Sequence, residues 1–439
     1  MQSAVDRWRH AGSTSGRVNA TRSGGVGGGV SARVVALLTL AAFINYVDRG
    51  NLATAGPLIR DQFALSNTQL GLLLSAFFWS YAPGQLPAGW LAERLDARRV
   101  LAAGLAVWGV ATALTGLASG FTMLLVLRVM LGLGESVMYP ASFKILAREA
   151  LEGQRGRANG FLAAGQISGP AFGTLVGGLM MAWLGWRVVF VVLGCVSLLW
   201  LWPWLKTPRS AVPQRLRGAQ DGPPTLMILR CRELWGSCLG GFCVAYSLYL
   251  VLSWLPVYLV KARGFSMAEM AQIGAGVYAL SAITSVLTGW VSDRWLTAGA
   301  GSNQVRKAGL LTGFAGLAAC MSVCAISGPL GSLLALAGCG VFLGILVPAY
   351  FATAQTLAGP DATARWYGVQ NFITNLAGIT APAITGVVVD RTGSFSSAFL
   401  IAAVLALLGM LAFGLIVRKV EPVDWRATVP EQLVPALPP

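Results

Sequence analysis

The chain has 439 residues, of which 55% are hydrophobic and only 11% are charged, and its mean hydropathy is +0.66. A water-soluble protein of this length needs far more polar surface, so the composition excludes that class. The net charge of +15 would suit a nucleic-acid partner. We expect no such partner, because the basic residues fall in the loops predicted on one side of a membrane.

Apolar stretches long enough to cross a lipid bilayer recur along the sequence, which predicts an all-α polytopic membrane protein. Charges, prolines and glycines divide them into twelve helices in two sets of six. The first set is expected near residues 33–55, 68–92, 99–118, 121–147, 157–183 and 186–205. The second set is expected near residues 233–260, 268–293, 306–326, 330–357, 364–389 and 396–418.

The two sets predict two pseudo-symmetric six-helix bundles with a polar linker between them. The linker is rich in proline and arginine, and the Gly/Ser/Arg-rich start of the chain lacks the early apolar core of a signal peptide. The expected divisions are a disordered cytoplasmic tail (1–32), the N-terminal bundle (33–206), a cytoplasmic linker (207–231), the C-terminal bundle (232–419) and a second cytoplasmic tail (420–439).

The distribution of basic residues predicts the orientation. With both termini in the cytoplasm, the segments on that side carry 24 of the 32 Lys and Arg residues, and the outside segments carry five. Such an excess marks the cytoplasmic side of bacterial membrane proteins, so we expect the inner membrane. The remaining three, Arg49, Arg128 and Lys144, fall within spans. Lys144 lies toward the cytoplasmic end of its helix, and its role is left open.

Residues that bind metals or carry out catalysis are scarce. The seven cysteines lie in or beside apolar stretches without the spacing of metal ligands, and the only histidine is His10 in the tail. The spans contain no nucleophile with a neighbouring base, and no extramembrane domain is present for a receptor to signal through. We therefore expect no metal, no cofactor, and neither an enzyme nor a receptor.

One six-residue pattern occurs at equivalent points of both halves. The second expected helix ends with GWLAER at residues 89–94, and the eighth ends with GWVSDR at residues 289–294. The repetition indicates an internal duplication. A plain basic loop is the alternative interpretation, and the second copy argues against it.

Two six-helix halves with the pattern G-x-x-x-(D/E)-R-x-x-x-R-R between helices two and three resemble the major facilitator superfamily. The resemblance covers nearly all of residues 33–419. It implies a monomer in which these charged residues lock the cytoplasmic side during alternating access, as a network that breaks and remakes. The predicted gating residues are Glu93, Arg94, Arg98, Arg99, Asp293 and Arg294.

Charged side chains inside the spans are the strongest functional signal, because each costs about 2.5–3.5 kcal/mol at a helix centre. Asn45, Asp48 and Arg49 form one stripe on the first helix. Arg128 and Glu135 lie two turns apart on one face of the fourth, about 10.5 Å along its axis. Of the 17 acidic residues, only Asp48 and Glu135 fall well inside spans.

Two interpretations of this charge cluster remain open. If protons are carried, Asp48 and Glu135 are almost the only candidates, and Arg49 and Arg128 offer planar guanidinium groups that suit a carboxylate. Two fixed cations with two protonatable acids favour an anion carried with protons. The alternative is a structural ion pair that joins helices one and four.

Neutral polar side chains on other spans can complete the site. Tyr81 and Gln85 share a face of helix two, Gln166 lies on helix five, and Asn371 and Asn375 are one turn apart on helix eleven. Each amide has an alternative role as a hydrogen-bonding contact between helices, worth about 0.6–2 kcal/mol.

Four motifs narrow the resemblance to the anion:cation symporter branch, which includes sugar-acid, tartrate and phthalate permeases and relatives of vesicular glutamate and sialic acid carriers. They are NYxDR at 45–49, WxYxxGQxPxGW at 79–90, RxxxGxxE at 128–135 followed by Tyr139-Pro140, and NFxxNxAG at 371–378. The resemblance implies that Asp48 and Glu135 are protonation sites. It also implies that the substrate cavity is lined by Arg49, Tyr81, Arg128, Gln166, Asn371 and Asn375.

One feature departs from that branch. Gly165, Gly169, Pro170 and Gly173 resemble the helix-five signature of drug antiporters. Close packing of small residues is the favoured interpretation, and efflux is kept as an alternative. The main expectation is import of a hexonate, hexuronate or aldarate with protons, with an aromatic carboxylate such as phthalate as the other substrate class considered.

Overall fold

The computed structural model describes residues 31–149, 152–208 and 223–425, and every regular element within those ranges is a helix. Nearly all of the expected tail 1–32, most of the linker and most of the tail 420–439 lie outside the described residues. Two described pieces of these segments are ordered. The linker ends in the short helix α10 (Thr225–Leu229), and the indole of Trp425 donates a hydrogen bond of 3.0 Å to the carbonyl of Ala358.

The fifth and sixth spans of the N-terminal bundle are two helices that meet at a kink inside α8 (Gly178–Leu199). Gly185 separates the two with a φ of 75°, a left-handed conformation that glycine adopts without strain. The elements are α2 (Ala32–Phe63), α3 (Asn67–Arg94), α4 (Ala97–Thr115), α5 (Phe121–Glu135), α6 (Met138–Glu149), α7 (Glu152–Phe172), the π-helix η1 (Gly173–Gly177), α8 (Gly178–Leu199) and α9 (Leu201–Leu205).

The C-terminal bundle has a similar glycine kink in its longest element, α14 (Pro329–Thr392). Gly359, with a φ of 66°, separates the fourth span of this half from the fifth. The elements are α11 (Arg232–Val257), η2 (Tyr258–Ala262), α12 (Met267–Thr297), α13 (Ser302–Ile326), α14 (Pro329–Thr392), α15 (Ser396–Leu411) and η3 (Ala412–Ile416).

The described helices confirm the expected architecture of twelve spans. Nine segments are long and apolar enough to cross a membrane, and one of them, Gly160–Leu205, contains the two spans that meet at Gly185. Helices α2 and α3 complete the set, although the polar residues of the candidate site interrupt their apolar sequence. The first helix continues to Phe63 instead of ending near residue 55, because Ala55, Pro57 and Ile59 are buried in the fold.

The internal duplication is visible in the local structure of the second and eighth spans. Both begin with a capping box, formed by Ser66 with Gln69 in α3 and by Ser266 with Glu269 in α12. Near the end of each span, an arginine guanidinium lies over the tryptophan ring of the repeated pattern. The distance from the guanidinium carbon to the ring centroid is 4.6 Å for Arg94 and Trp90, and 4.2 Å for Arg294 and Trp290.

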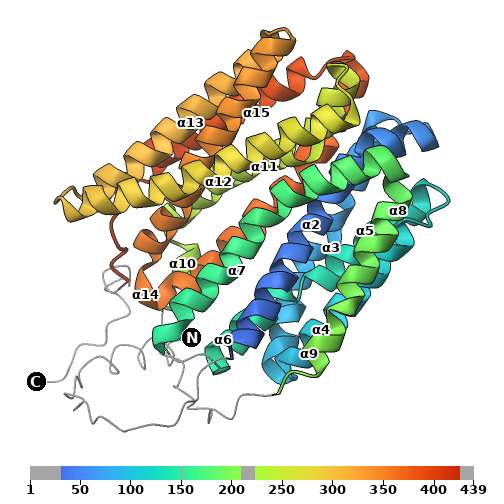
Figure 1. Cartoon of the computed structure of the whole chain (residues 1–439). Helices are drawn as coiled ribbons and strands as arrows, with labels where there is room; N and C mark the ends of the chain where they lie inside the picture. The colour runs from blue at the N-terminus through green and yellow to red at the C-terminus, as the bar shows by residue number, and fades with distance from the viewer. Residues whose placement is uncertain (1–30, 150–151, 209–222, 426–439) are drawn as a thin grey trace, which may run out of the picture.

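The two bundles lie side by side, with the N-terminal half in blue to green and the C-terminal half in yellow to red (Figure 1). We call the side where α2 begins the termini side, and the side where α2 ends and α3 begins the far side. On the far side the bundles are in direct contact. The carboxylate of Asp390, on α14, accepts hydrogen bonds from the Asn67 amide side chain at 2.8 Å and from the backbone N–H groups of Asn67 and Thr68 at 3.0 and 2.6 Å.

Further contacts close the same side. Lys261 forms an ion pair with Asp61 across the two bundles. Gly71 lets α3 approach α14 so closely that an added Cβ would lie 2.4 Å from the carbonyl oxygen of Pro382. Among the described residues, no hydrogen bond or ion pair joins the bundles closer to the termini side than the one between Asn371 and Gln85, at 2.8 Å. The structure is therefore closed on its far side.

Candidate functional site

Three charged side chains are almost completely removed from solvent inside the N-terminal bundle. Asp48 on α2 is 1% exposed, and Arg128 and Glu135 on α5 are 4% and 0% exposed. Asp48 and Glu135 are the only buried carboxylates in the described part of the chain. Helix α5 ends at Glu135 and α6 begins at Met138, next to Pro140, whose missing N–H interrupts the helical hydrogen bonds.

Arg49 and Glu135 form a direct ion pair between α2 and α5. The Arg49 Nε donates to the Glu135 Oε2 at 2.8 Å. The same guanidinium lies over three aromatic rings. Its carbon is 4.8 Å from the ring centroid of Tyr46, 4.8 Å from that of Phe77 and 4.2 Å from that of Tyr81. The pair of Arg49 and Glu135 therefore matches the alternative interpretation, a structural ion pair that joins helices one and four.

Arg128 is different, because no described residue pairs with it. Its guanidinium makes no hydrogen bond or ion pair to the described chain, its Nε is buried without a partner, and its nearest aromatic ring is Phe77 at 5.8 Å. A buried cation without a partner is costly, so a polar or anionic group is expected to occupy the space beside it.

Asp48 is also incompletely satisfied. Thr112 on α4 donates one long hydrogen bond of 3.4 Å to Oδ2, and Oδ1 has no partner in the described part of the chain. The amide of Asn45, one turn before it on α2, is buried, and neither its nitrogen nor its oxygen has a partner among the described residues. Unpaired buried polar atoms are rare in proteins, so this concentration marks a place that water or a ligand is expected to fill.

Gln166 and Tyr81 belong to the walls of the cluster. The Gln166 amide donates to the hydroxyl of Tyr46 at 2.9 Å and accepts from that of Tyr139 at 2.8 Å. Tyr81 is buried and stacks on Phe77 with ring centroids 4.9 Å apart, so it forms a platform under Arg49. A continuous path of contacts thus runs from α7 through α2 to α5.

The two asparagines from the C-terminal half occupy different positions. Asn371 is exposed and donates to Gln85 of α3 at 2.8 Å, which links the two bundles. Asn375 is 5% exposed and donates back to the carbonyl of Asn371 at 2.8 Å. The geometry therefore gives Asn371 a contact across the interface and Asn375 a contact within its own helix.

The contacting residues Phe77, Thr112 and Tyr139 were not among the expected site residues. Tyr139 and Phe77 do lie in or beside the motif windows on helices two and four, so their positions carried a usable signal. Thr112 had none, because a lone threonine in an apolar helix is common.

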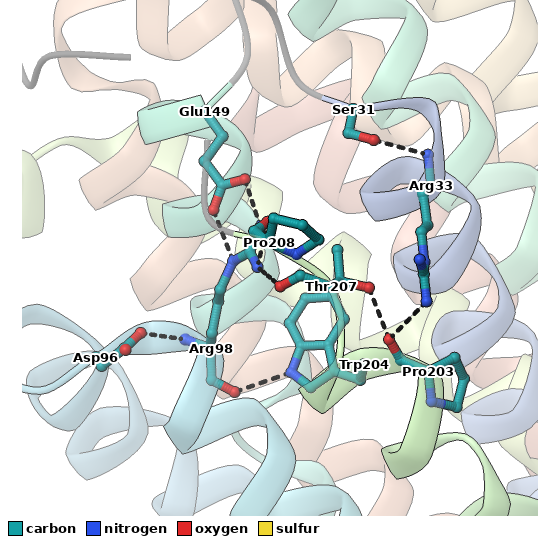
Figure 2. A network of polar contacts seen from close by, with 9 residues as sticks. All are labelled: Ser31, Arg33, Asp96, Arg98, Glu149, Pro203, Trp204, Thr207 and Pro208. Atoms are coloured by element: carbon teal, nitrogen blue, oxygen red, sulfur yellow. Dashed lines mark hydrogen bonds and ion pairs between the residues drawn. The ribbon is translucent and has the colours of Figure 1, made fainter. Parts of the chain in front are cut away.

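The predicted gating residues lie at the termini side, where their described contacts fall into several groups. Arg98 binds Glu149 at the end of α6 through two hydrogen bonds, of 2.8 and 2.7 Å, and donates from Nη1 to the carbonyls of Thr207 and Pro208 at 3.0 and 3.1 Å. Figure 2 shows this cluster, in which the Trp204 indole also donates to the Arg98 carbonyl. Glu149 was missed because its pairing with Arg98 connects segments far apart in the sequence.

The described side chains of the remaining members make no contact with the Arg98 guanidinium, although Asp96 accepts from the Arg98 backbone N–H at 3.0 Å and also pairs with Arg99. Arg99 lies 3.9 Å from Asp96 and its side chain is 82% exposed, and Asp293 is exposed. Arg94 and Arg294 contact tryptophans, as described above. The side chain of Glu93 lies outside the described residues. In this conformation the described contacts do not join all six residues, so their role as a gate that breaks and remakes stays a prediction. The ammonium group of Lys144 donates to the carbonyl of Ala92 at the end of α3.

The Arg98 cluster gives a direct stability test. Arg98→Gln should lower the free energy of unfolding by about 3–5 kcal/mol, because it leaves the carboxylate of Glu149, 12% exposed, without its cation. Arg99→Gln, on the adjacent exposed residue, should cost about 0–1 kcal/mol. Thermal unfolding of the purified variants measures both, and equal effects would contradict the assignment.

The glycines of α7 and η1 pack against α2. An added Cβ would lie 2.4 Å from the Thr39 carbonyl oxygen at Gly165, 2.6 Å from the Tyr46 Cβ at Gly169, and 3.2 Å from the Val47 carbonyl oxygen at Gly173. These distances support the packing interpretation of the helix-five signature and give no separate support for efflux.

A family model described as Major Facilitator Superfamily matches residues 38–382 and 306–438. The chain belongs to the major facilitator superfamily. A hexuronate transporter of Bacillus subtilis is 31% identical over 410 residues, which cover 89% of this chain and 94% of that protein. A probable sulfoacetate transporter of Cupriavidus necator is 30% identical over 398 residues, which cover 86% and 92%.

Among solved structures, a bacterial homologue of the human lysosomal transporter Spinster, in an inward-facing and occupied conformation, is similar with a TM-score of 0.73. The two chains are 21% identical, and the match covers 88% of this chain and 96% of that one, so the likeness shows the superfamily fold. The family and the curated relatives are transporters, which confirms the expectation that this chain is a transporter and not an enzyme.

Proposed function

We propose that this protein imports a small organic anion, of the sugar-acid class, together with protons. The observation that carries the proposal is Arg128, a buried guanidinium without a hydrogen-bond or ion-pair partner in the described part of the chain. A planar guanidinium binds a carboxylate through two parallel hydrogen bonds, and the aromatic rings beside it exclude water. The hexuronate relative supports the sugar-acid class.

Charge balance in the buried cluster supports coupling to protons. Asp48 and Glu135 balance Arg49 and Arg128 when both acids are ionised, so the cluster is neutral without a guest. A bound monoanion would leave one uncompensated negative charge in a region of low polarity, which is costly. One proton on either acid restores neutrality, so anion and proton each favour binding of the other.

The same balance suits uptake across a membrane that is negative inside. Moving one negative charge inward costs about 2.3 kcal/mol per 100 mV, and one proton moving with it cancels this cost. The proposed cycle loads the anion and proton while the far side is open, closes that side as in the present structure, and releases both on the termini side. This cycle places both termini in the cytoplasm of a bacterium and treats the chain as a monomer.

The test uses purified protein in proteoliposomes. Acidification of the external buffer should stimulate uptake of radiolabelled galacturonate, and a proton ionophore should remove the stimulation. Sulfoacetate and phthalate serve as competitors that define the substrate class. Absence of acid-stimulated galacturonate uptake would contradict the proposal.

A further inference from the structure

A cavity on the far side is lined by three basic residues and one acidic residue. Its volume is about 720 Å³, and it lies among the ends of α2, η2, α13 and α14. Three lining residues are basic: Arg60 from the N-terminal bundle, and Lys261 and Arg263 from the C-terminal bundle. The one acidic lining residue, Asp390, directs its carboxylate to the first turn of α3, as described above.

Arg263 is held in a fixed orientation by its neighbours. Its Nε donates to the Tyr258 hydroxyl at 2.8 Å, and its Nη2 donates to the Ser327 carbonyl at 2.8 Å and to the Ser332 hydroxyl at 2.7 Å. Tyr258 and Ser332 are 2% and 1% exposed, so these partners are rigid. The second terminal nitrogen, Nη1, has no hydrogen-bond partner within the described ranges. A preorganised guanidinium with a free donor binds an anion at small entropic cost.

Arg60 faces the same cavity from the other bundle. Its side chain makes no hydrogen bond or ion pair with any described residue, and Lys261 has only the exposed contact with Asp61. Arg60 follows Arg49 by eleven positions on α2, about 16 Å along the helix axis, so this cavity is separate from the buried cluster. A small anion held here would touch cations of both bundles.

We propose that this cavity is a second anion-binding site, which takes a small carboxylate on the far side of the protein. The site needs both bundles in contact, so an anion bound between Arg60 and Arg263 stabilises the conformation that is closed on the far side. The assignment of a carboxylate rests on the proposed function. The cation arrangement itself suits any small anion, so inorganic anions are tested beside it.

The experiment measures binding of galacturonate and of sodium sulfate by calorimetry to full-length protein in nanodiscs. Arg128→Gln removes the buried cation first, so that only the far-side site remains. We expect residual galacturonate binding in this variant, weakened about tenfold or more by adding Arg60→Gln or Arg263→Gln. Arg391→Gln removes an exposed cation of the same side that does not line the cavity, and should change nothing.

The outcomes separate this inference from the proposed function. Residual binding that is absent, or that neither Arg60→Gln nor Arg263→Gln weakens, overturns the site. Residual binding of sulfate without galacturonate overturns the carboxylate assignment. If the wild type binds galacturonate no better than Arg128→Gln does, the proposed function fails while the far-side site stands. The Arg60 side chain has no hydrogen-bond or ion-pair partner among the described residues, so its variant reports on binding even if Arg263→Gln disturbs folding.

Discussion

Replacing Arg128 with lysine should weaken binding of the transported anion by about tenfold to a hundredfold, because one point charge cannot form the two parallel hydrogen bonds of a guanidinium. Arg128→Gln should remove binding at this site. Isothermal titration with galacturonate measures both effects. Lysine binding as tightly as arginine would contradict the bidentate interaction.

The stability of the substrate-free variants separates a binding role from a structural one. Arg128 has no described hydrogen-bond or ion-pair partner, and a proton on one of the two buried acids restores the neutrality of the cluster, so Arg128→Gln should change the unfolding temperature little. The protein should at the same time lose the stabilisation that substrate gives, which is about 2.7 kcal/mol at a hundred times Kd.

Arg49→Gln is the matched comparison on the same cluster. Because Arg49 pairs with Glu135 at 2.8 Å, its loss leaves a fully buried carboxylate without its cation and should cost about 3–5 kcal/mol of stability. If Arg128→Gln destabilises the free protein as much as Arg49→Gln does, Arg128 is a structural residue and the proposed function loses its main support.

The helices and the polar stripe were predictable because both depend on local periodicity. Apolar length decides where a span begins and ends, and a spacing of three and four residues places Asn45, Asp48 and Arg49 on neighbouring positions of one helix. The duplication was predictable for the same reason. The extension of α2 to Phe63 was not, because it depends on burial against other helices.

The partners of the charges could not be predicted, since a helix position gives a direction and not a distance. Sequence alone allowed Arg49 and Arg128 the same role, whereas the structure pairs Arg49 with Glu135 and gives Arg128 no partner among the described residues. It equally gave no means of choosing Glu149 as the partner of Arg98, or α3 as the contact of Asp390. These pairings depend on tertiary packing between distant segments.

The second prediction concerns the coupling of anion and proton through Glu135. Glu135→Gln keeps the shape of the side chain and an oxygen that can accept from Arg49, but it fixes the buried cluster at a net charge of plus one. A monoanion then binds without needing a proton, because it alone restores neutrality. The variant should therefore bind galacturonate with little dependence on pH.

Transport by this variant should separate into two activities. Accumulation of galacturonate driven by a pH gradient should fall more than tenfold, because each pH unit contributes about 1.4 kcal/mol only if a proton is carried. Exchange of labelled for unlabelled galacturonate at equal pH should persist, since it needs no net proton movement. Glu421→Gln, on an exposed residue after the last span, serves as the control and should behave as the wild type. Full pH-driven accumulation by Glu135→Gln would exclude Glu135 as the coupling acid and leave Asp48, with its unpartnered Oδ1, as the one buried carboxylate in the described chain that could carry the proton.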